Sequence, residues 1–185
     1  MLDLDCEKAI FTAIEFCSSE CIKDKKLGYL CLSSIMKRDS EMINLISNQI
    51  RKVQFILSKD IEDEKNDQCS VSALISCAYF LNQELQNQLI SSVLQSSRGN
   101  DLKSNACCSI LLQYAKENDA ALNTVASMIE LKLKKNSLSF EWILLTCELV
   151  AVKPSRFLQM IPKFYEIIVA ESENWIIIKI LKMVF

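Results

Sequence analysis

The side chains best suited to metal or redox chemistry in this sequence are its nine cysteines. Zinc sites usually contain Cys-x-x-Cys pairs, and no such pair is present. The arrangement most similar to a zinc site is Cys17-x-x-x-Cys21 together with Cys6, in which Cys17 and Cys21 are one helical turn apart. The cysteines are odd in number, they fall mostly in apolar runs, and the acidic segment 1–5 lacks the basic start of a signal peptide. We therefore expect reduced cytoplasmic thiols that pack as small apolar side chains, without a metal.

Catalytic pairs are also hard to assemble from this composition. The chain contains no histidine, which excludes Ser-His and Cys-His pairs as well as histidine metal sites. Only two glycines, Gly28 and Gly99, are available, so a glycine-rich phosphate loop is excluded. Carboxylates gather in 58–68 (SKDIEDEKNDQ), where we expect nothing to desolvate them. The sequence predicts a protein that is no enzyme and needs no cofactor; an enzyme would require a buried polar cluster that the sequence does not reveal.

Short basic clusters offer a different kind of chemistry, namely attraction of anions. They are Lys25–Lys26, Arg38, Arg51–Lys52 and Lys132–Lys135. With 21 basic against 23 acidic residues, the chain as a whole has no reason to bind nucleic acid. The simplest interpretation is that these cations complement helix ends and solvated rims. The functional alternative is contact with acidic lipid or with the surface of a GTPase.

The elements that position these side chains are predicted to be helices. Half of the residues are hydrophobic, only two are proline, and apolar residues recur at helical spacing almost throughout. We expect a first helix over about 7–19, then helix pairs beginning near 27, 70, 101, 138 and 174, with an acidic loop between repeats at 58–68. The intervals of roughly 30 to 45 residues are typical of helical repeats. They predict one all-α domain over 1–185, an α-solenoid of antiparallel helix pairs like HEAT or armadillo repeats, with an ordinary bundle as the alternative.

The segment Trp175–Phe185 (WIIIKILKMVF) is almost continuously apolar and is too short to cross a bilayer, which takes about 20 residues. We expect Trp175 in the core and Lys179 and Lys182 on the solvent-facing stripe of this helix. A helix of this kind needs a partner or further repeats to cover it.

Two blocks of sequence carry a resemblance to a known family. Lys25–Lys52 reads KKLGYLCLSSIMKRDSEMINLISNQIRK, which resembles the trunk pattern K-[KR]-[LIV]-G-Y-L followed by N-x-I-[RK]-K in the adaptin family. Ser172–Phe185 (SENWIIIKILKMVF) is similar to a segment of the delta-type large chain of adaptor protein complex 3. The motif residues are Gly28, Tyr29, Leu30, Asn48, Ile50, Arg51, Lys52, Asn174, Trp175, Lys179 and Lys182.

Physical reasons can be given for part of this pattern. Gly28 would let two helices approach closely, and Tyr29 would place a polar tip at the edge of the packing. One departure from the family is evident: adaptins usually carry R-K-K-A where this chain has 101–106 (DLKSNA), so three positive charges are reduced to Lys103. Any contact that depends on that basic cluster is therefore not expected here.

The resemblance implies a fragment of an adaptin trunk that acts as a non-catalytic scaffold in vesicle transport. Its implied partners are a small sigma-type chain, a beta-type large chain and a medium chain, together with an Arf-family GTPase at Golgi or endosomal membranes. Complex 3 delivers cargo to lysosome- or vacuole-like organelles. An unrelated HEAT or armadillo scaffold, such as a transport receptor or an enzyme-regulatory subunit, remains the alternative because it would share the periodicity but not the two motif blocks.

Overall fold

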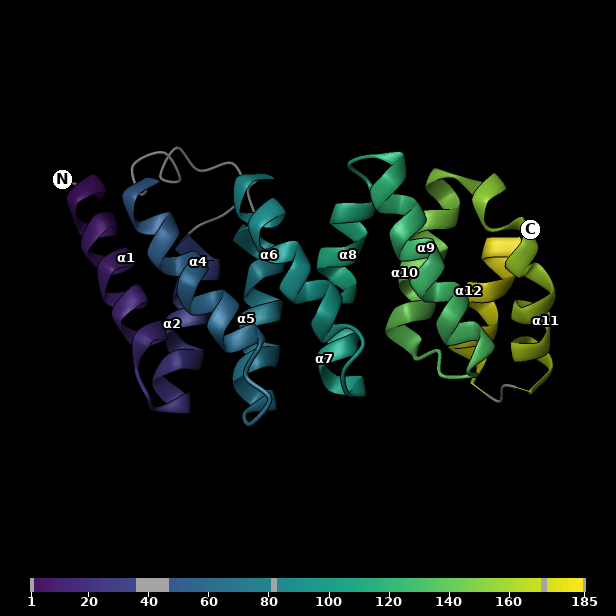
Figure 1. Cartoon of the computed structure of the whole chain (residues 1–185), viewed down its shortest axis with the longest axis horizontal. Helices are drawn as coiled ribbons and strands as arrows, with labels where there is room; N and C mark the ends of the chain where they lie inside the picture. Colours follow the sequence, from purple (N-terminus) through teal and green to yellow (C-terminus); the bar gives the residue numbers. More distant parts are fainter. Residues whose placement is uncertain (1, 36–46, 81–82, 171–172, 185) are drawn as a thin grey trace. The chain divides into compact units, whose positions relative to one another are not determined.

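The computed structural model describes the backbone of 2–35, 47–80, 83–170 and 173–184. All regular elements within these ranges are helices (Figure 1), which confirms the predicted all-α class. The chain divides into two compact units, Met1–Ile110 and Leu111–Phe185, where the sequence predicted one domain over 1–185. Each helix of a stacked array packs mainly on its neighbours, so no single core has to run through the whole chain.

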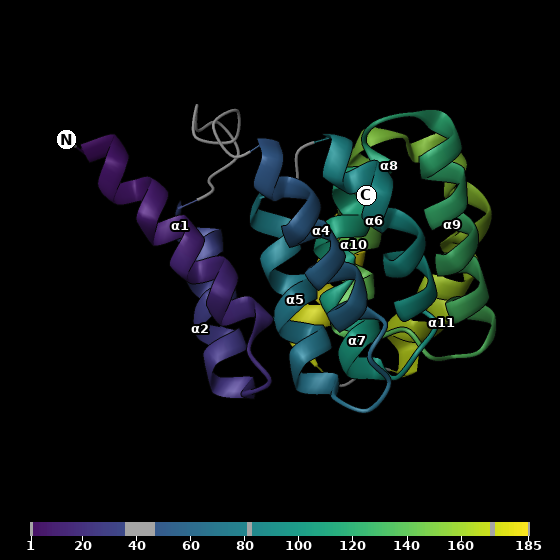
Figure 2. The same cartoon turned by 60° about the vertical axis from the view of Figure 1, so that its left-hand side comes forward.

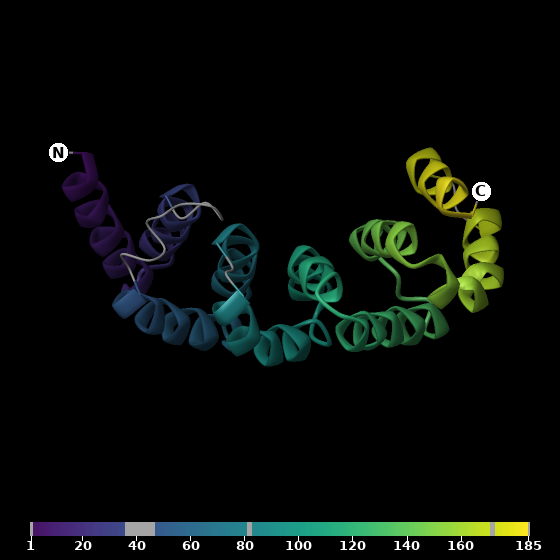
Figure 3. The same cartoon turned by 90° about the horizontal axis from the view of Figure 1, so that it is seen from above.

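Unit 1 consists of two rows of helices. The helices are α1 Leu2–Ser18, α2 Ile22–Ile35, α4 Ser47–Ile61, α5 Asp67–Phe80, α6 Gln83–Ser96 and α7 Asp101–Ala106. Helices α1, α4 and α6 contact one another in sequence and form one row, whereas α2, α5 and α7 form the other (Figure 3). Contacts of α1 with α2 and of α4 with α5 join the rows (Figure 2). The unit is therefore a stack of antiparallel helix pairs, the arrangement of an α-solenoid.

Unit 2 repeats the same principle around a central helix. Helix α8, Cys108–Ala115, crosses the division between the units, and it is followed by α9 Asp119–Lys134, α10 Phe140–Val152, the short 3₁₀ turns η1 Pro154–Arg156 and η2 Leu158–Met160, α11 Ile161–Ala170 and α12 Asn174–Val184. Helix α10 contacts both α9 and α12, and α11 also contacts α12. The fully buried Trp142 of α10 lies under the ammonium group of Lys132, 4.8 Å from the ring centroid.

Several helix bounds differ from those expected from periodicity. The helix expected from near 27 begins at Ile22, because Ser19 Oγ accepts a hydrogen bond from the Cys21 N–H and donates one to Asp24 at the start of the helix. The helices expected near 70 and 138 begin at Asp67 and Phe140, whereas those at Asp101 and Asn174 begin where the pattern placed them.

The packed pairs also have a different phase from the expected one. The sequence treated the first helix as single and paired each later helix with its successor, beginning near 27. In the structure α1 packs on α2, α4 on α5, α9 on α10 and α11 on α12. Periodicity along one chain shows which residues are apolar, but it does not show which neighbouring helix covers them.

Gly28 lies at a close approach of α1 and α2. A Cβ atom added to Gly28 would lie 2.6 Å from the backbone nitrogen of Cys17 and 2.7 Å from the carbonyl oxygen of Ala13. Both atoms belong to the backbone of α1, so they cannot move aside as the end of a flexible side chain can. The short α1–α2 distance therefore depends on the absence of a side chain at this position.

We expect Gly28→Ala to lower the free energy of unfolding by about 1–3 kcal/mol through overpacking. Intrinsic helix propensity acts in the opposite direction and favours alanine by about 1 kcal/mol, so the sign of the effect separates the two causes. Urea denaturation followed by circular dichroism measures it. Leu30→Ala, at an exposed position of the same helix, is the matched control. A stabilising Gly28→Ala substitution would show that the two helices do not need this close approach.

Candidate functional site

A buried carboxylate joins three segments of unit 1. Asp60, with 3% of its surface exposed, accepts hydrogen bonds from Lys25 Nζ at 2.5 and 2.7 Å and from Tyr29 Oη at 2.6 Å. The hydroxyl of Ser70 donates to the backbone carbonyl of Asp60 at 2.7 Å. Asp60 thereby connects the end of α4 to α2 through side chains and to α5 through its backbone. We call Lys25, Tyr29, Asp60 and Ser70 the polar hub.

The hub overturns two expectations from the sequence. Tyr29 is 1% exposed, so its hydroxyl lies deep in the packing and not at the edge. Residues 58–61 belong to α4 and not to a solvated loop, since α4 ends at Ile61 and α5 begins at Asp67. Val53, Leu57, Asp60 and Ile61 follow helical spacing and are all buried, which places Asp60 at a core position. If the helical spacing of buried residues is continued past Leu57, it reaches Asp60 and Ile61, and this signal in the sequence could have identified Asp60 as a core residue.

The rest of the acidic segment holds neighbouring helices together. Glu62 accepts a hydrogen bond from Ser92 of α6 at 2.6 Å, and Asp67 accepts one from Asn100 at 2.6 Å. Lys103 of α7 is buried, donates to the carbonyl of Asp63 at 2.6 Å and lies 3.2 Å from the Asp67 carboxylate. Lys103, the single cation in 101–106, therefore binds groups within unit 1.

The hub binds its own groups and offers no reactive one. The Asp60 carboxylate already receives three hydrogen bonds, from an ammonium group and a phenol. Burial, together with the bond to Asp60, raises the pKa of Tyr29 far above its ordinary value, so the phenol stays protonated. Burial likewise raises the pKa of the Cys17 thiol to about 12. A thiol in that state is a poor nucleophile and a poor metal ligand, which favours a structural role.

The cysteine side chains that the structure describes are all free. Cys17 is buried and Cys21 is exposed, so these two thiols do not face the same space. The side chain of Cys6 lies outside the described residues. Within those residues, no cluster of three or more cysteine or carboxylate side chains is arranged to hold a metal ion.

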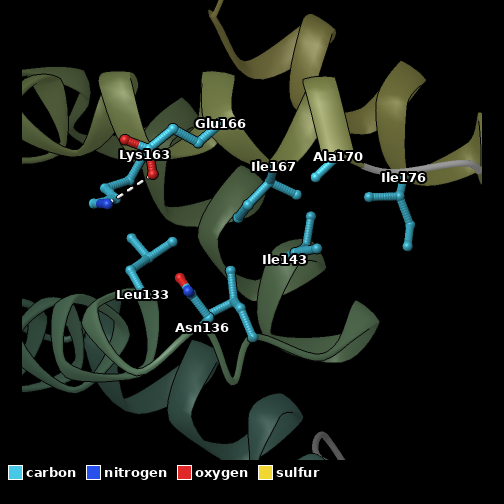
Figure 4. Close-up of a pocket in the computed structure, with 9 residues that line it drawn as sticks. Leu133, Asn136, Ile143, Lys163, Glu166, Ile167, Ala170 and Ile176 are labelled. Carbon is cyan, nitrogen blue, oxygen red and sulfur yellow. Dashed lines mark hydrogen bonds and ion pairs between the residues drawn. The ribbon is translucent and has the colours of Figure 1, made fainter.

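A cavity of about 440 Å³ lies in unit 2 among α9, α10, α11 and α12 (Figure 4). Its apolar wall includes Ile143, Ile167 and Ile176. The charges at its edge, Lys163 and Glu166, pair with each other at 2.7 Å. The cavity thus has an apolar lining, and the two charges at its edge neutralise each other. This arrangement suits an apolar group better than a charged substrate.

The row of α2, α5 and α7 exposes apolar side chains to solvent. Leu30 is 64% exposed, and Leu27, Ile75 and Leu102 are also exposed. Of the motif residues 28–30, Gly28 and Tyr29 thus pack inward whereas Leu30 faces water. We call Leu27, Leu30, Ile75 and Leu102 the apolar face.

Helix α12 presents its motif residues to solvent. Lys179 and Lys182 are exposed, and so are Asn174 and Trp175. Trp175 is 73% exposed, so the expectation that it belongs to the core is wrong. Ile180, which is fully buried, lies on the other side of the helix at 100° per residue.

The remaining motif residues lie on α4. Arg51 and Lys52 are exposed. Asn48 and Ile50 belong to the helix, but their side chains lie outside the described residues, as does Arg38 altogether. The two motif blocks therefore fall in different units.

Within the described residues, stacked helix pairs, an internal polar hub, and exposed apolar and basic side chains are the features of a helical-repeat protein. No helix among the described residues has the length and hydropathy to cross a membrane. No model of a protein family matches the chain.

Comparison with curated proteins confirms the resemblance read from the two motif blocks. The chain is 29% identical over 178 residues to "AP-3 complex subunit delta" of Saccharomyces cerevisiae, a match that covers 94% of this chain and 18% of that protein. It is 25% identical over 186 residues to "AP-3 complex subunit delta-1" of Bos taurus, covering 99% of this chain and 15% of that protein. The chain thus spans less than a fifth of the length of these relatives.

We expect Asp60→Ala to lower the free energy of unfolding by about 3–5 kcal/mol, because it leaves the partly buried Lys25 ammonium and the buried Tyr29 hydroxyl without their acceptor. Glu64→Ala, at an exposed position of the same acidic segment, is the control and should change the value by less than about 0.5 kcal/mol. Urea denaturation measures both. Equal effects of the two substitutions would show that the hub does not hold unit 1 together.

Stability should also depend on alkaline pH. The folded chain keeps Cys17 and Tyr29 protonated where the unfolded chain loses those protons, so their contribution is complete below pH 9 and falls as pH rises through 9 toward 12. Cys17→Ala should make the decline that starts near pH 9 less steep, although buried Cys77, whose pKa is also raised by burial, still contributes to it. Tyr29→Phe should do the same for the part that starts near pH 10. Urea midpoints across this range test it, with Cys21→Ala as the exposed control. An unchanged slope in both variants contradicts the assignment.

Proposed function

We propose that this chain is part of the trunk of a delta-type large subunit of a heterotetrameric vesicle-coat adaptor complex. Similarity to AP-3 delta subunits along nearly the whole chain is the observation that carries the proposal. Its role is that of a non-catalytic scaffold, which agrees with a polar hub that is internally saturated. The match covers less than a fifth of each relative, which supports a role for this chain as one stretch of helix pairs within a longer subunit.

The partners of this scaffold are a small sigma-type chain, a beta-type large chain and a medium chain. An Arf-family GTPase recruits the complex from the cytoplasm to Golgi or endosomal membranes, from which cargo travels to lysosome- or vacuole-like organelles. Within each unit, contacts between neighbouring helix pairs supply a stiff frame.

The apolar face is the surface that we assign to the small chain. Leu27, Leu30, Ile75 and Leu102 come from three adjacent helices of one row. Helices α2 and α5 bury the equally apolar Leu32 and Leu74, and α7 exposes Leu102 while it buries Lys103. Specific protein interfaces have an apolar centre and cover about 800 Å² on each partner, more than one helix can offer. A row of three helices provides a surface of the required breadth.

Co-expression of this chain with the small sigma-type chain of the same organism tests the proposal. We expect the two to elute together in size exclusion, and Leu30→Asp with Ile75→Asp to abolish co-elution by placing charges at the centre of the interface. Phe55→Asp, on the opposite row, is the matched control and should leave co-elution intact. Since all three positions are exposed, circular dichroism should show unchanged folding.

Failure of the unaltered chain to bind the small chain would favour a different helical scaffold. Binding that survives the double substitution would instead place the small chain on another surface. The two results are distinguishable because the first concerns the partner and the second concerns only the face.

A further inference from the structure

The short link between α9 and α10 contains an exposed hydroxyl group that follows a basic run. Residues 132–138 read KLKKNSL, so Lys134 and Lys135 stand three and two positions before Ser137, and Leu138 follows it directly. Both of these lysines and Ser137 are exposed. The proposed scaffold function uses none of these side chains. We call residues 132–138 the basic link.

The backbone leaves the helix just before Ser137. Helix α9 ends at Lys134, and Asn136 has a φ of 50°, the left-handed conformation that commonly ends helices. The N–H of Ser137 donates to the carbonyl of Lys132 at 3.0 Å and closes the last turn. Helix α10 begins only at Phe140. Ser137 therefore lies in a helix cap, which can open locally while the interior of α9 stays folded.

The hydroxyl group of Ser137 is weakly held. Its Oγ lies 3.5 Å from the carbonyl oxygen of Lys132, at the limit of a hydrogen bond. The exposed hydroxyls of Thr124 and Ser127 instead donate to carbonyls four residues earlier in α9, at 2.9 and 2.8 Å. An enzyme that needs extended backbone would have to unwind the middle of α9 to use either of them. Ser137 is therefore the more available acceptor for a group transfer.

The residues around Ser137 indicate which class of enzyme would recognise it. Protein kinases select substrates partly by charge pattern, and the carboxylates of a basic-directed kinase hold cations two and three positions before the acceptor. Lys135 and Lys134 stand at these positions, and the half-buried Leu138 supplies an apolar side chain after the acceptor. Lys134 pairs with Glu130 at 2.9 Å, but this pair is exposed and contributes little, so a kinase can replace it.

We propose that Ser137 is phosphorylated by a serine/threonine protein kinase that requires basic residues before its acceptor. In this step the Ser137 Oγ forms a bond to the γ-phosphorus of ATP, the bond from that phosphorus to the β–γ bridging oxygen breaks, and ADP leaves with the electron pair. The hydroxyl proton passes to the catalytic aspartate of the kinase. The phosphate adds a charge of about −2 beside three lysines, so the basic link loses most of its positive charge.

Incubation of the whole chain with ATP and the catalytic subunit of cAMP-dependent protein kinase tests the proposal. We expect peptide mass spectrometry to place phosphate on Ser137, and Ser137→Ala to remove that signal. Fragment spectra must separate this site from Ser139 and from Ser40, which also follows two basic residues in the sequence. Phosphate found only at either of those serines, or at no serine, overturns the proposal.

Two matched variants measure recognition of the basic link. Lys134→Gln with Lys135→Gln should lower kcat/KM for Ser137 on the order of 100-fold, since each lost contact between charged groups costs about tenfold. Lys23→Gln with Lys65→Gln removes two exposed cations elsewhere and should leave this value unchanged. Melting temperatures should show that both variants are folded. Equal losses in the two variants, or no loss in either, contradict recognition through the link.

A synthetic peptide of residues 130–141 supplies the unfolded reference for the same kinase. Because only the cap has to open, we expect the whole chain to react at more than about a thousandth of the peptide's rate, which is above the unfolded fraction of typical domains. A lower rate would show that the folded chain is no substrate and would overturn the proposal. The assay contains no adaptor chain, so its result is independent of the co-expression experiment.

Discussion

The buried Asp60 carboxylate is the constraint on which unit 1 depends. A charge removed from water is tolerated only when partners replace its lost hydration, and here Lys25 and Tyr29 of α2 supply them. Because Asp60 stands at the end of α4 and Ser70 of α5 binds its carbonyl, the same residue sets the relation among three helices. Gly28 belongs to this arrangement, since the close approach of α1 and α2 places Tyr29 in its buried position.

In unit 1, the polar groups of the acidic segment bind neighbouring helices, and the two rows of helices expose side chains of different chemistry. The acidic segment turns its carboxylates and carbonyls toward Lys25, Ser92, Asn100 and Lys103. Helix α4 exposes Arg51, Lys52 and Lys59, whereas the other row exposes leucine and isoleucine.

Unit 2 is held by different means. Its centre is the buried Trp142, covered by Lys132, and polar links between Lys153 and Asp119 and between Arg156 and Asn123 join α9 to the region after α10. These links lie at exposed positions and are individually weak, so apolar packing carries most of the cohesion. The exposure of Trp175 and Ile178 shows that even a strongly apolar helix buries only the side that meets α10 and α11.

The sequence by itself determined the all-α class and the resemblance to delta-type adaptor chains, because helical periodicity and motif spacing are local properties that can be read along the chain. The tertiary structure decided the rest: that Asp60 is buried, that Tyr29 points inward, that Leu30 and Trp175 face water, and that the chain forms two units. Burial depends on which helix covers a residue, and that neighbour can lie more than thirty positions away, as Lys25 does from Asp60. A charged residue at a core position resembles a surface residue until its partner on another helix is known.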